Sequence, residues 1–416
     1  MTEFQSAFLK TVFERGYVQD CTDRDGLDAR LRAQPLVAYI GFDCTADSLH
    51  VGSLIQLMLL RRWQQTGNKP IVLMGGGTTQ IGDPSGKDAS RQLLSKAEIA
   101  RNKAGIGQVF ARFLRFGDGP SDAIMVDNAD WLDELHYIPF LREVGRHFSV
   151  NRMLTLDSVK LRLDREQTLS FLEFNYMVLQ AYDFLELARR HDCAVQMGGS
   201  DQWGNIVSGV ELGRRIENRA LYGLTSPLLT TASGAKMGKT AEGAVWLNAA
   251  RLAPYGYWQF WRNTEDADVG RFLKLFTDLP MDEIARLDAL RDGEINHAKE
   301  KLATEATAML HGGDAAHAAA ETARRVFAEG GTGAELPTLA ISGQNLAAGV
   351  PLIQALHEVG LVSSRSDARR QIRSANTSVN NAIITSETHL LTEVDVKDGV
   401  IKLSVGKKRH GLIRPV

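Results

Sequence analysis

The chain has 416 residues, of which 44% are apolar and 24% charged, so we expect a globular protein of two or three domains. No stretch approaches the roughly 18 consecutive apolar residues of a membrane helix, and the N-terminus lacks the features of a secretion signal. Three scattered cysteines argue against a disulfide framework and a structural zinc site. We therefore expect a cytoplasmic protein that contacts no membrane and carries no resident metal.

Charge is distributed unevenly along the chain, although its net value is only −2. Residues 360–416 contain ten Lys and Arg against five Asp and Glu, a net charge of +5, which leaves −7 for the rest. A basic tail on an acidic body predicts that the tail binds a polyanion. A solvated charged face is the alternative explanation.

Residues 1–229 alternate short β-branched runs with amphipathic helical segments, which predicts an α/β, Rossmann-like domain with a parallel sheet between helices. Such sheets bind ligands beyond the carboxyl ends of their strands, where the glycine clusters at 75–77 and 198–199 lie. The predicted elements are strands at 37–40, 70–74, 123–126 and 194–197 and a helix at 54–65.

The remaining chain predicts two smaller domains. Residues 230–253 would connect to an all-helical domain at 254–329, followed by a glycine-rich linker at 330–349 and a small α+β domain at 350–416. The expected helices are at 255–263, 268–276, 282–292, 295–311 and 352–359, and a basic helix is expected at 366–375, before strands at 377–380 and 400–405.

The segment from Tyr39 to Ser53 leaves the first predicted strand and enters the first helix of this alternation. Backbone amides at a helix start, with the His50 imidazole and a hydroxyl nearby, form a cradle for polyphosphate. Gly52 would let a nucleotide lie close against the backbone. For His50 alone, a capping histidine is an equally good explanation.

A second segment, Lys236 to Thr240, places two lysines in a loop rich in glycine and small polar residues. Mobile cations suit charge that develops in a transition state, as when pyrophosphate leaves. Two lysines on an exposed loop can also be ordinary solvated side chains. Following the His50-x-Gly52 element on a parallel sheet, however, this segment resembles the second signature of class I aminoacyl-tRNA synthetases.

A polar stripe on the helix around residues 170–190 suggests a ligand site. Tyr176, Gln180 and Asp183 fall at i, i+4 and i+7 on one helix face, among largely apolar neighbours. Buried polar groups need partners, and a polar ligand would supply them. An internal hydrogen-bond network is the alternative.

Four segments together resemble the bacterial tyrosyl-tRNA synthetase family over essentially the whole chain: 39–50, 73–87, 176–183 and 198–205. The resemblance implies activation of L-tyrosine by ATP with Mg²⁺ and transfer of tyrosine to tRNA(Tyr). It also implies a homodimer, to which residues 130–148 contribute unless they form an internal helix. The tail is similar to the S4-type RNA-binding module.

The resemblance implies roles for individual residues. The tyrosine site would comprise Tyr39 and Asp183 at the phenolic hydroxyl, Asp83, Tyr176 and Gln180 at the α-ammonium group, and Gln202. Catalysis at the phosphates would involve Thr45, His50, Lys87, Arg91, Lys236, Lys239 and Thr240. ATP would bind His50, Gly52, Ser53, Gly199, Asp201, Lys236 and Lys239, with Asp201 at the ribose. The tail would bind RNA through Arg365, Arg369, Arg370, Arg373, Lys407 and Lys408.

The chain departs from the family pattern at two positions and leaves two rival interpretations. Ser53 replaces the second signature histidine, and Gly238 replaces a serine, which should loosen the lysine loop. Tryptophanyl-tRNA synthetase is the nearest rival, but indole offers no phenol to Asp183. A non-catalytic RNA-binding protein is the other, and it would need no pyrophosphate cradle.

Overall fold

The computed structural model describes residues 4–85, 93–234, 237–240, 243–328, 336–406 and 409–416. The chain divides into two compact units. The first comprises Met1–Gly238, Trp246–Asn248 and Glu265–Leu290, and the second comprises Lys239–Val245, Ala249–Thr264 and Arg291–Val416. Within the described residues, no helix combines the length and apolarity that crossing a membrane requires.

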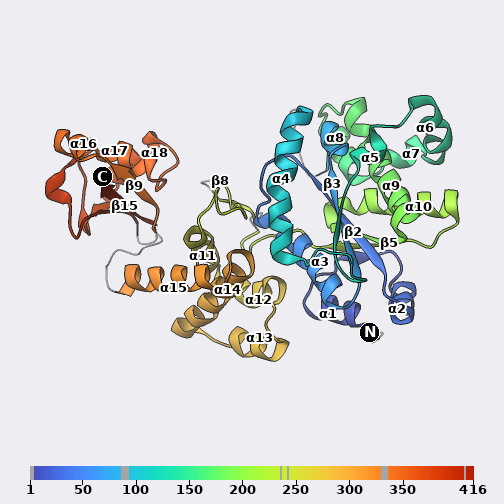
Figure 1. Ribbon diagram of the computed structural model, residues 1–416, viewed down its shortest axis with the longest axis horizontal. Coiled ribbons are helices and arrows are strands. Elements are labelled where there is room, and N and C mark those ends of the chain that lie inside the picture. Colours follow the sequence, from blue (N-terminus) through green and yellow to red (C-terminus); the bar gives the residue numbers. More distant parts are fainter. Residues whose placement is uncertain (1–3, 86–92, 235–236, 241–242, 329–335, 407–408) are drawn as a thin grey trace. The chain divides into compact units, whose positions relative to one another are not determined.

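A six-stranded sheet forms the centre of the first unit (Figure 1). The strand order is β1-β6-β5-β2-β3-β4, with all neighbours parallel except the antiparallel pair β1 and β6. Its strands are β1 (Asp20–Cys21), β2 (Val37–Asp43), β3 (Lys69–Gly75), β4 (Ile124–Asp127), β5 (Cys193–Gly199) and β6 (Tyr222–Ser226). The predicted α/β fold with a parallel sheet is confirmed.

Helices cover both faces of this sheet, as a buried parallel sheet requires. Figure 1 shows α3 and α4 on one side and α9 and α10 on the other. The helices of this unit are α1 (Ala7–Glu14), α2 (Arg24–Ala33), α3 (Leu54–Gln65), α4 (Lys96–Phe113), α5 (Ala129–Leu132), α6 (Tyr137–Glu143), α7 (Val150–Met153), α8 (Asp157–Asp164), α9 (Phe171–His191), α10 (Trp203–Glu217), α12 (Val269–Phe276) and α13 (Met281–Asp288).

Local sequence explains why α9 forms where it does. Its first turn carries a capping box, in which the Ser170 side chain accepts from the Glu173 backbone and Glu173 returns the contact. The helix ends at Asp192, which adopts a left-handed conformation with φ 51°. Between these ends, Phe184 and Leu187 pack against Tyr39 and Ile71 of the sheet. The helix therefore lies along the sheet with its polar stripe near β2.

The boundary of the predicted helical domain differs from the structure. Helices α12 and α13, expected within 254–329, belong to the unit that contains the sheet. Arg62 of α3 donates to the Thr277 carbonyl at 2.6 Å and pairs with Asp278, and Arg15 donates to the Leu279 carbonyl. These buried arginines tie the segment to the sheet unit, a connection that helix periodicity does not reveal.

The second unit begins with a short hairpin and three helices that pack together. Gly312, with φ 93°, separates the last two helices, because the left-handed region suits glycine. The elements are β7 (Lys239–Thr240), β8 (Gly243–Ala244), α11 (Pro254–Arg262), α14 (Ile295–His311) and α15 (Gly313–Ala328).

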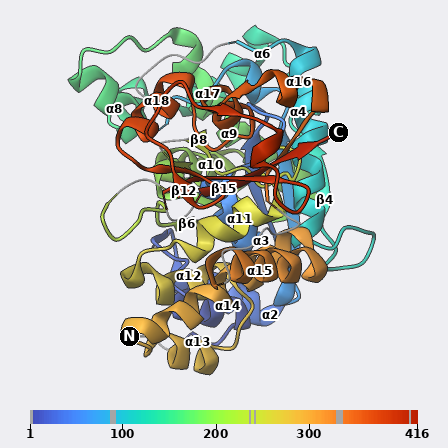
Figure 2. The ribbon, with the colours of Figure 1, turned by 90° about the vertical axis from the view of Figure 1, so that its left-hand side faces the viewer.

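The C-terminal part is a small α+β fold with the sheet order β12-β11-β14-β15-β9. Figures 1 and 2 show α16, α17 and α18 gathered on one side of this sheet. Leu352 and Ile372 of the helices pack with Ile401 and Leu403 of the sheet. The elements are β9 (Thr338–Ile341), α16 (Gly343–Ala348), β10 (Val350–Pro351), α17 (Leu352–Glu358), α18 (Arg365–Arg373), β11 (Thr377–Val379), β12 (Ala382–Ile383), β13 (Leu390–Leu391), β14 (Ile401–Val405) and β15 (Arg409–Pro415).

The linker predicted at 330–349 is wrong over its second half. Thr338–Ile341 forms an edge strand that pairs in parallel with β15, and Gly343–Ala348 forms a helix capped by Ser342. Few charges and several glycines suggested a linker. The partner of this strand lies at the far end of the domain, so local sequence does not identify it.

Candidate active site

The expected site residues lie around the point where the order of the parallel strands reverses. From β2 the chain continues to β3 and β4 on one side and then returns to β5 and β6 on the other. Ligands of open α/β sheets bind at the carboxyl ends of the strands at such a point. Strand β2 leads into the His50 segment and β5 into Asp201, while α9 carries the polar stripe. One edge of the sheet thus brings the separate motifs together.

At one end of the site, a buried hydroxyl lies near a buried carboxylate. Tyr39 is 1% exposed, and its hydroxyl has no hydrogen-bond partner among the described residues. Asp183 is 2% exposed and accepts hydrogen bonds from Asn128 Nδ2 at 2.9 Å and Trp131 Nε1 at 2.8 Å. Trp131 shares a buried cluster with Tyr39. Such an unsatisfied hydroxyl is costly in a native interior unless a ligand completes it.

Burial changes the proton affinity of both groups. It raises the pKa of Tyr39 well above its ordinary value, and the neighbouring Asp183 charge raises it further. Burial raises the pKa of Asp183 to about 8, although the hydrogen bonds from Asn128 and Trp131 act in the opposite direction. At neutral pH the ligand-free protein therefore holds Asp183 mainly in its neutral form.

We expect Asp183→Asn to remove a pH dependence from the stability of the ligand-free protein. Because the folded-state pKa of Asp183 is raised, its stabilising contribution is full below the unfolded pKa of 3.8 and is lost as the pH rises through about 8. The wild-type free energy of unfolding should fall relative to the variant by about 1.4 kcal/mol per pH unit between roughly pH 5 and 7. Urea denaturation across this range measures it, and a constant difference would contradict the raised pKa.

A second set of polar groups surrounds Asp83. Asp83 accepts from Gln202 Nε2 at 2.8 Å, and Asn205 Nδ2 connects Gln180 Oε1 at 2.9 Å with Gln202 Oε1 at 3.3 Å. The structure therefore joins two of the expected ammonium-site residues, Asp83 and Gln180, with Gln202 in one network. The carboxylate of Asp83 gives this network a negative charge suited to a cation.

Tyr176 contacts a residue that the sequence analysis did not single out. Its hydroxyl donates to Asp43 Oδ2 at 3.1 Å, and Thr78 donates to the other oxygen of Asp43 at 2.8 Å. Burial raises the pKa of Tyr176 well above its ordinary value, with further contributions from the Asp43 and Asp83 charges. Tyr176 is thus held by one carboxylate and lies in the electrostatic field of a second, and Asp43 joins the site.

The histidine segment and the lysine loop contact each other. His50 Nδ1 accepts from the Gly52 backbone at 2.9 Å, which places the proton of the neutral ring on Nε2. The capping interpretation of His50 is therefore confirmed, and the ring nitrogen on the opposite side, Nε2, carries the N–H. A Cβ on Gly238 would lie 2.8 Å from Gly52 N and 3.1 Å from His50 Nδ1.

Gly238 also has φ 102°, which glycine adopts without strain. Its absent side chain allows the loop to lie against the histidine segment, so its role is to permit a close approach. From the sequence we expected Gly238 only to loosen the lysine loop, which does not explain its close approach to Gly52 and His50.

The other expected nucleotide residues lie on neighbouring loops. Asp201 is exposed in the 3₁₀ turn Ser200–Gln202 after β5, and a Cβ on Gly199 would lie 2.5 Å from its Oδ1. Thr45 is exposed in the loop after β2. Ser53 precedes α3 and makes no side-chain capping bond. Gly199 thus lets the Asp201 carboxylate lie against the backbone.

Several expected residues cannot be placed. Lys239 and Thr240 form strand β7, but their side chains are outside the described part of the structure. The residues that lie wholly outside it are Lys87, Arg91, Lys236, Lys407 and Lys408.

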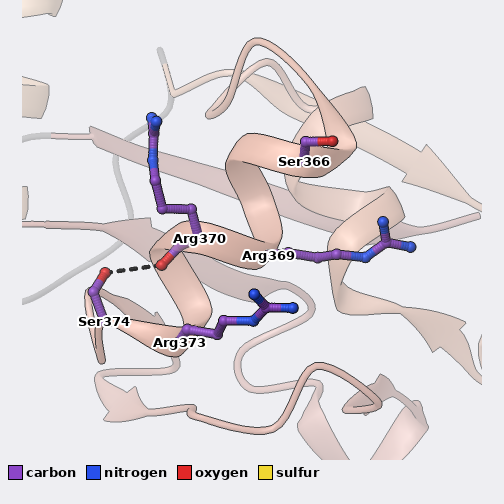
Figure 3. A pocket seen from close by; sticks show the side chains of 5 residues that line it. All are labelled: Ser366, Arg369, Arg370, Arg373 and Ser374. Atoms are coloured by element: carbon purple, nitrogen blue, oxygen red, sulfur yellow. Dashed lines mark hydrogen bonds between the residues drawn. The ribbon is translucent and has the colours of Figure 1, made fainter.

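The expected RNA-binding arginines of the tail lie together on one helix. Arg365, Arg369, Arg370 and Arg373 are all exposed on α18. With Ser366 and Ser374, the last three line an open pocket of about 530 Å³, drawn in Figure 3. The structure therefore gathers these positive charges on one surface.

Sequence reasoning missed the residues that hold Asp183 in place. Asn128 is buried; its Oδ1 accepts from the Gly77 backbone at 2.8 Å, and its Nδ2 donates to Asp183. The glycines after β3 therefore make room for polar side chains that follow β4. The sequence feature that could have identified these residues is the polar pair Asp127 and Asn128, directly after the strand predicted at 123–126.

Comparison with known proteins agrees with these motifs. Residues 31–328 match the family described as "tRNA synthetases class I (W and Y)". A tyrosine–tRNA ligase from Rhodospirillum rubrum is 65% identical over 414 residues, covering 100% of this chain and 99% of that protein. One from Methylocella silvestris is 61% identical over 412 residues, covering 99% and 98%. These relatives match the chain over its whole length, including the tail.

Solved structures show the same fold. A C-terminally truncated mitochondrial tyrosyl-tRNA synthetase from Aspergillus nidulans has a TM-score of 0.70 and 30% identity, over 78% of this chain and 95% of that one. A tryptophanyl-tRNA synthetase from Plasmodium falciparum has a TM-score of 0.54 at 11% identity, over 75% and 84%, which indicates a shared fold alone. The chain therefore belongs to the tyrosine–tRNA ligase family of class I aminoacyl-tRNA synthetases.

Proposed function

We propose that the chain recognises L-tyrosine through Tyr39 and Asp183 and carries out the family's two-step reaction, adenylation by ATP and transfer to tRNA(Tyr). The observation that carries this proposal is the buried Tyr39 hydroxyl without a described partner beside a buried carboxylate. A phenolic hydroxyl would fill that gap, donating to Asp183 and accepting from Tyr39. Tryptophan and phenylalanine lack this hydroxyl, so they would leave the Tyr39 hydroxyl without a partner and offer no donor to Asp183.

The opposite end of the substrate would meet the acidic network. Asp83, held by Gln202, and the Tyr176 hydroxyl would bind the α-ammonium group, with Gln180 beside them. Asp43 adds a second negative charge next to Tyr176. An ammonium ion between such groups forms charge-assisted hydrogen bonds, which are stronger than neutral ones. These contacts would fix the carboxylate of tyrosine for attack.

In the first step, a carboxylate oxygen of tyrosine attacks the α-phosphorus of ATP, and the bond to the pyrophosphate oxygen breaks. Pyrophosphate leaves with the bonding electrons, so cations and hydrogen-bond donors must meet its charge. We assign this task to His50 Nε2 and Thr45, with Gly52 and Ser53 bordering the nucleotide. The remaining proposed contributors are Lys87, Arg91, Lys236, Lys239 and Thr240.

The ribose and the metal ion complete the nucleotide site. Asp201, beside Gly199, is proposed to accept hydrogen bonds from the ribose hydroxyls. Mg²⁺ is proposed to arrive with ATP, because it keeps water and phosphate oxygens as ligands. Among the described residues no three His, Cys, Asp or Glu side chains group as a metal site, so the phosphates would supply its principal ligands.

In the second step, a ribose hydroxyl of the terminal adenosine of tRNA takes the tyrosyl group and releases AMP. We propose that residues 254–328 meet the anticodon region and that the S4-like tail binds RNA through the arginines of α18. Protein synthesis uses the charged tRNA in the cytoplasm, so we place the enzyme there.

We also propose that two copies of the chain associate through α6 and its neighbours. Tyr137, Ile138 and Leu141 are exposed there, together with Val150 and Phe171. Exposed apolar side chains gathered in one region mark interaction surfaces. The alternative derived from sequence, an internal position for residues 130–148, holds for the buried Trp131 and Val144 but not for Tyr137, Ile138 and Leu141.

ATP–pyrophosphate exchange with tyrosine, tryptophan and phenylalanine tests the proposed substrate. We expect rapid exchange with tyrosine alone, because the other two side chains lack the hydroxyl that satisfies Tyr39 and Asp183. Exchange driven by tryptophan would assign the chain to the tryptophan branch of the fold. Absence of exchange with all three would favour a non-catalytic RNA-binding protein.

We expect Tyr39→Phe to weaken recognition of tyrosine moderately without harming the fold. Losing one neutral hydrogen bond should lower kcat/KM for tyrosine activation about three- to tenfold. Removing a buried hydroxyl without a described partner should leave the melting temperature of the ligand-free protein unchanged or raise it. Exchange kinetics and thermal melting measure both effects. Unchanged kcat/KM would remove Tyr39 from the site.

A further inference from the structure

The α18 arginines are not equivalent in their contacts. Arg369 and Arg373 stand one helical turn apart, and Figure 3 shows both side chains extended in the same direction, while Arg370 points elsewhere. Glu387, in the turn between β12 and β13, contacts both: Arg369 Nε lies 3.8 Å from its Oε2, and Arg373 Nε pairs closely with its Oε1. Arg370 instead pairs with Asp367 at 2.6 Å.

Glu387 uses one edge of each guanidinium and leaves the other available. A guanidinium carries five N–H donors in a rigid fork, and Glu387 meets the Nε side of both arginines. Within the described part of the chain, Arg369 and Arg373 make their ion pairs through Nε and not through their terminal amino groups. Arg369 and Arg373 line the 530 Å³ pocket, and their terminal amino groups suit bidentate recognition of a phosphate.

The stability of the fold does not explain this arrangement. The side chains of Arg369, Arg373 and Glu387 are 52%, 70% and 30% exposed, and exposed ion pairs contribute little to stability. A carboxylate also halves the net charge of the pair, which on charge alone opposes binding of a polyanion. The remaining benefit is order, because two long side chains lose less freedom on binding when they are already held in place.

We propose that Glu387 is a positioning residue that holds Arg369 and Arg373 as a preformed clamp for a phosphate of the RNA backbone. The inference rests on the proposed RNA-binding role of the tail and adds the residue that orders its arginines. Glu387 does not contact the phosphate; it fixes the direction in which the two guanidinium groups present their amino edges.

Binding of a tRNA(Tyr) transcript to the full-length protein, measured over a range of salt concentrations, tests the clamp. We expect Glu387→Ala to weaken binding about three- to tenfold, although losing the carboxylate makes the net charge of the protein more positive by one. Glu387→Gln keeps an oxygen that accepts from Nε, so it should bind within about twofold of the wild type. The matched control Glu393→Ala removes an equal charge from the turn Glu393–Asp395 and should not weaken binding.

Each alternative gives a distinct result. Tighter binding by Glu387→Ala would show that the carboxylate masks the arginines and would overturn the inference, as would equal losses in both Glu387 variants. The double variant Arg369→Ala/Arg373→Ala should bind weakly. The slope of the logarithm of its binding constant against the logarithm of the salt concentration should be shallower by about 0.7 to 1.8. Wild-type binding by that double variant would refute the RNA-binding role of α18 and the clamp with it. Tyrosine-dependent pyrophosphate exchange should stay unchanged in every variant.

Discussion

Asp183→Ala is expected to reduce kcat/KM for tyrosine activation by about 10³-fold or more. The substitution removes a buried acceptor for the phenolic hydroxyl, whereas the Asn128 and Trp131 donors that it also leaves unpaired affect the fold with either amino acid. The lost hydrogen bond contributes roughly 0.5–3 kcal/mol, depending on the charge of the acceptor, and a substrate hydroxyl buried without an acceptor costs about 1–3 kcal/mol more. Pyrophosphate exchange as a function of tyrosine concentration measures the loss.

Phenylalanine provides the internal control for this variant. It lacks the hydroxyl that Asp183 would bind, so its slow activation should change little between the wild type and Asp183→Ala. The preference for tyrosine over phenylalanine should therefore collapse, although the nucleotide residues are intact. Wild-type exchange with tyrosine, or equal losses for both amino acids, would contradict the proposed recognition of the hydroxyl.

Gly238→Ala is expected to lower kcat for adenylate formation about 10²-fold while leaving KM for tyrosine within about twofold. The new Cβ would lie 2.8 Å from the Gly52 backbone nitrogen, so the lysine loop must move away from the histidine segment. A displacement of about 1 Å at reacting groups costs roughly this factor. Tyr39 and Asp183 are untouched, which is why tyrosine binding should persist. Single-turnover kinetics separates the two parameters.

Gly234 offers a matched control in the same loop. It also has a positive φ, 85°, but a Cβ there would meet nothing within 4 Å. Gly234→Ala therefore introduces similar backbone strain without the collision and should retain most of the wild-type kcat. Equal losses in the two variants would assign the effect to strain and would refute a role for the contact between the motifs.

The parallel sheet and the arrangement of the motifs along its edge could be predicted because their signals are local. The strands predicted from β-branched runs overlap β2, β3, β4 and β5, with ends that differ by a few residues. The predicted helix at 54–65 coincides with α3. Tyr176, Gln180 and Asp183 share a helix face, as their spacing required. A parallel sheet then collects the ends of distant strands at one edge, so correct strands were enough to place the segments that follow β2 and β5 at the same edge.

The features that the sequence did not reveal depend on partners far along the chain. Strand β9 pairs with β15, and α12 is tied to α3 by Arg62. Asn128 and Trp131 hold Asp183 from a segment after β4, which carries no motif of its own. Glu387 meets the α18 arginines from a surface turn. Periodicity and composition describe one segment at a time and cannot identify such pairs.

A crystal structure of the protein with a non-hydrolysable analogue of tyrosyl-adenylate would test directly whether this site reads a phenolic hydroxyl. We predict that the ring hydroxyl of the analogue lies about 2.6–3.2 Å from both the Tyr39 hydroxyl and an Asp183 oxygen. Asn128 and Trp131 should still donate to Asp183 in that complex. A ring hydroxyl beyond hydrogen-bonding distance of both Tyr39 and Asp183 would contradict the assignment of the substrate site.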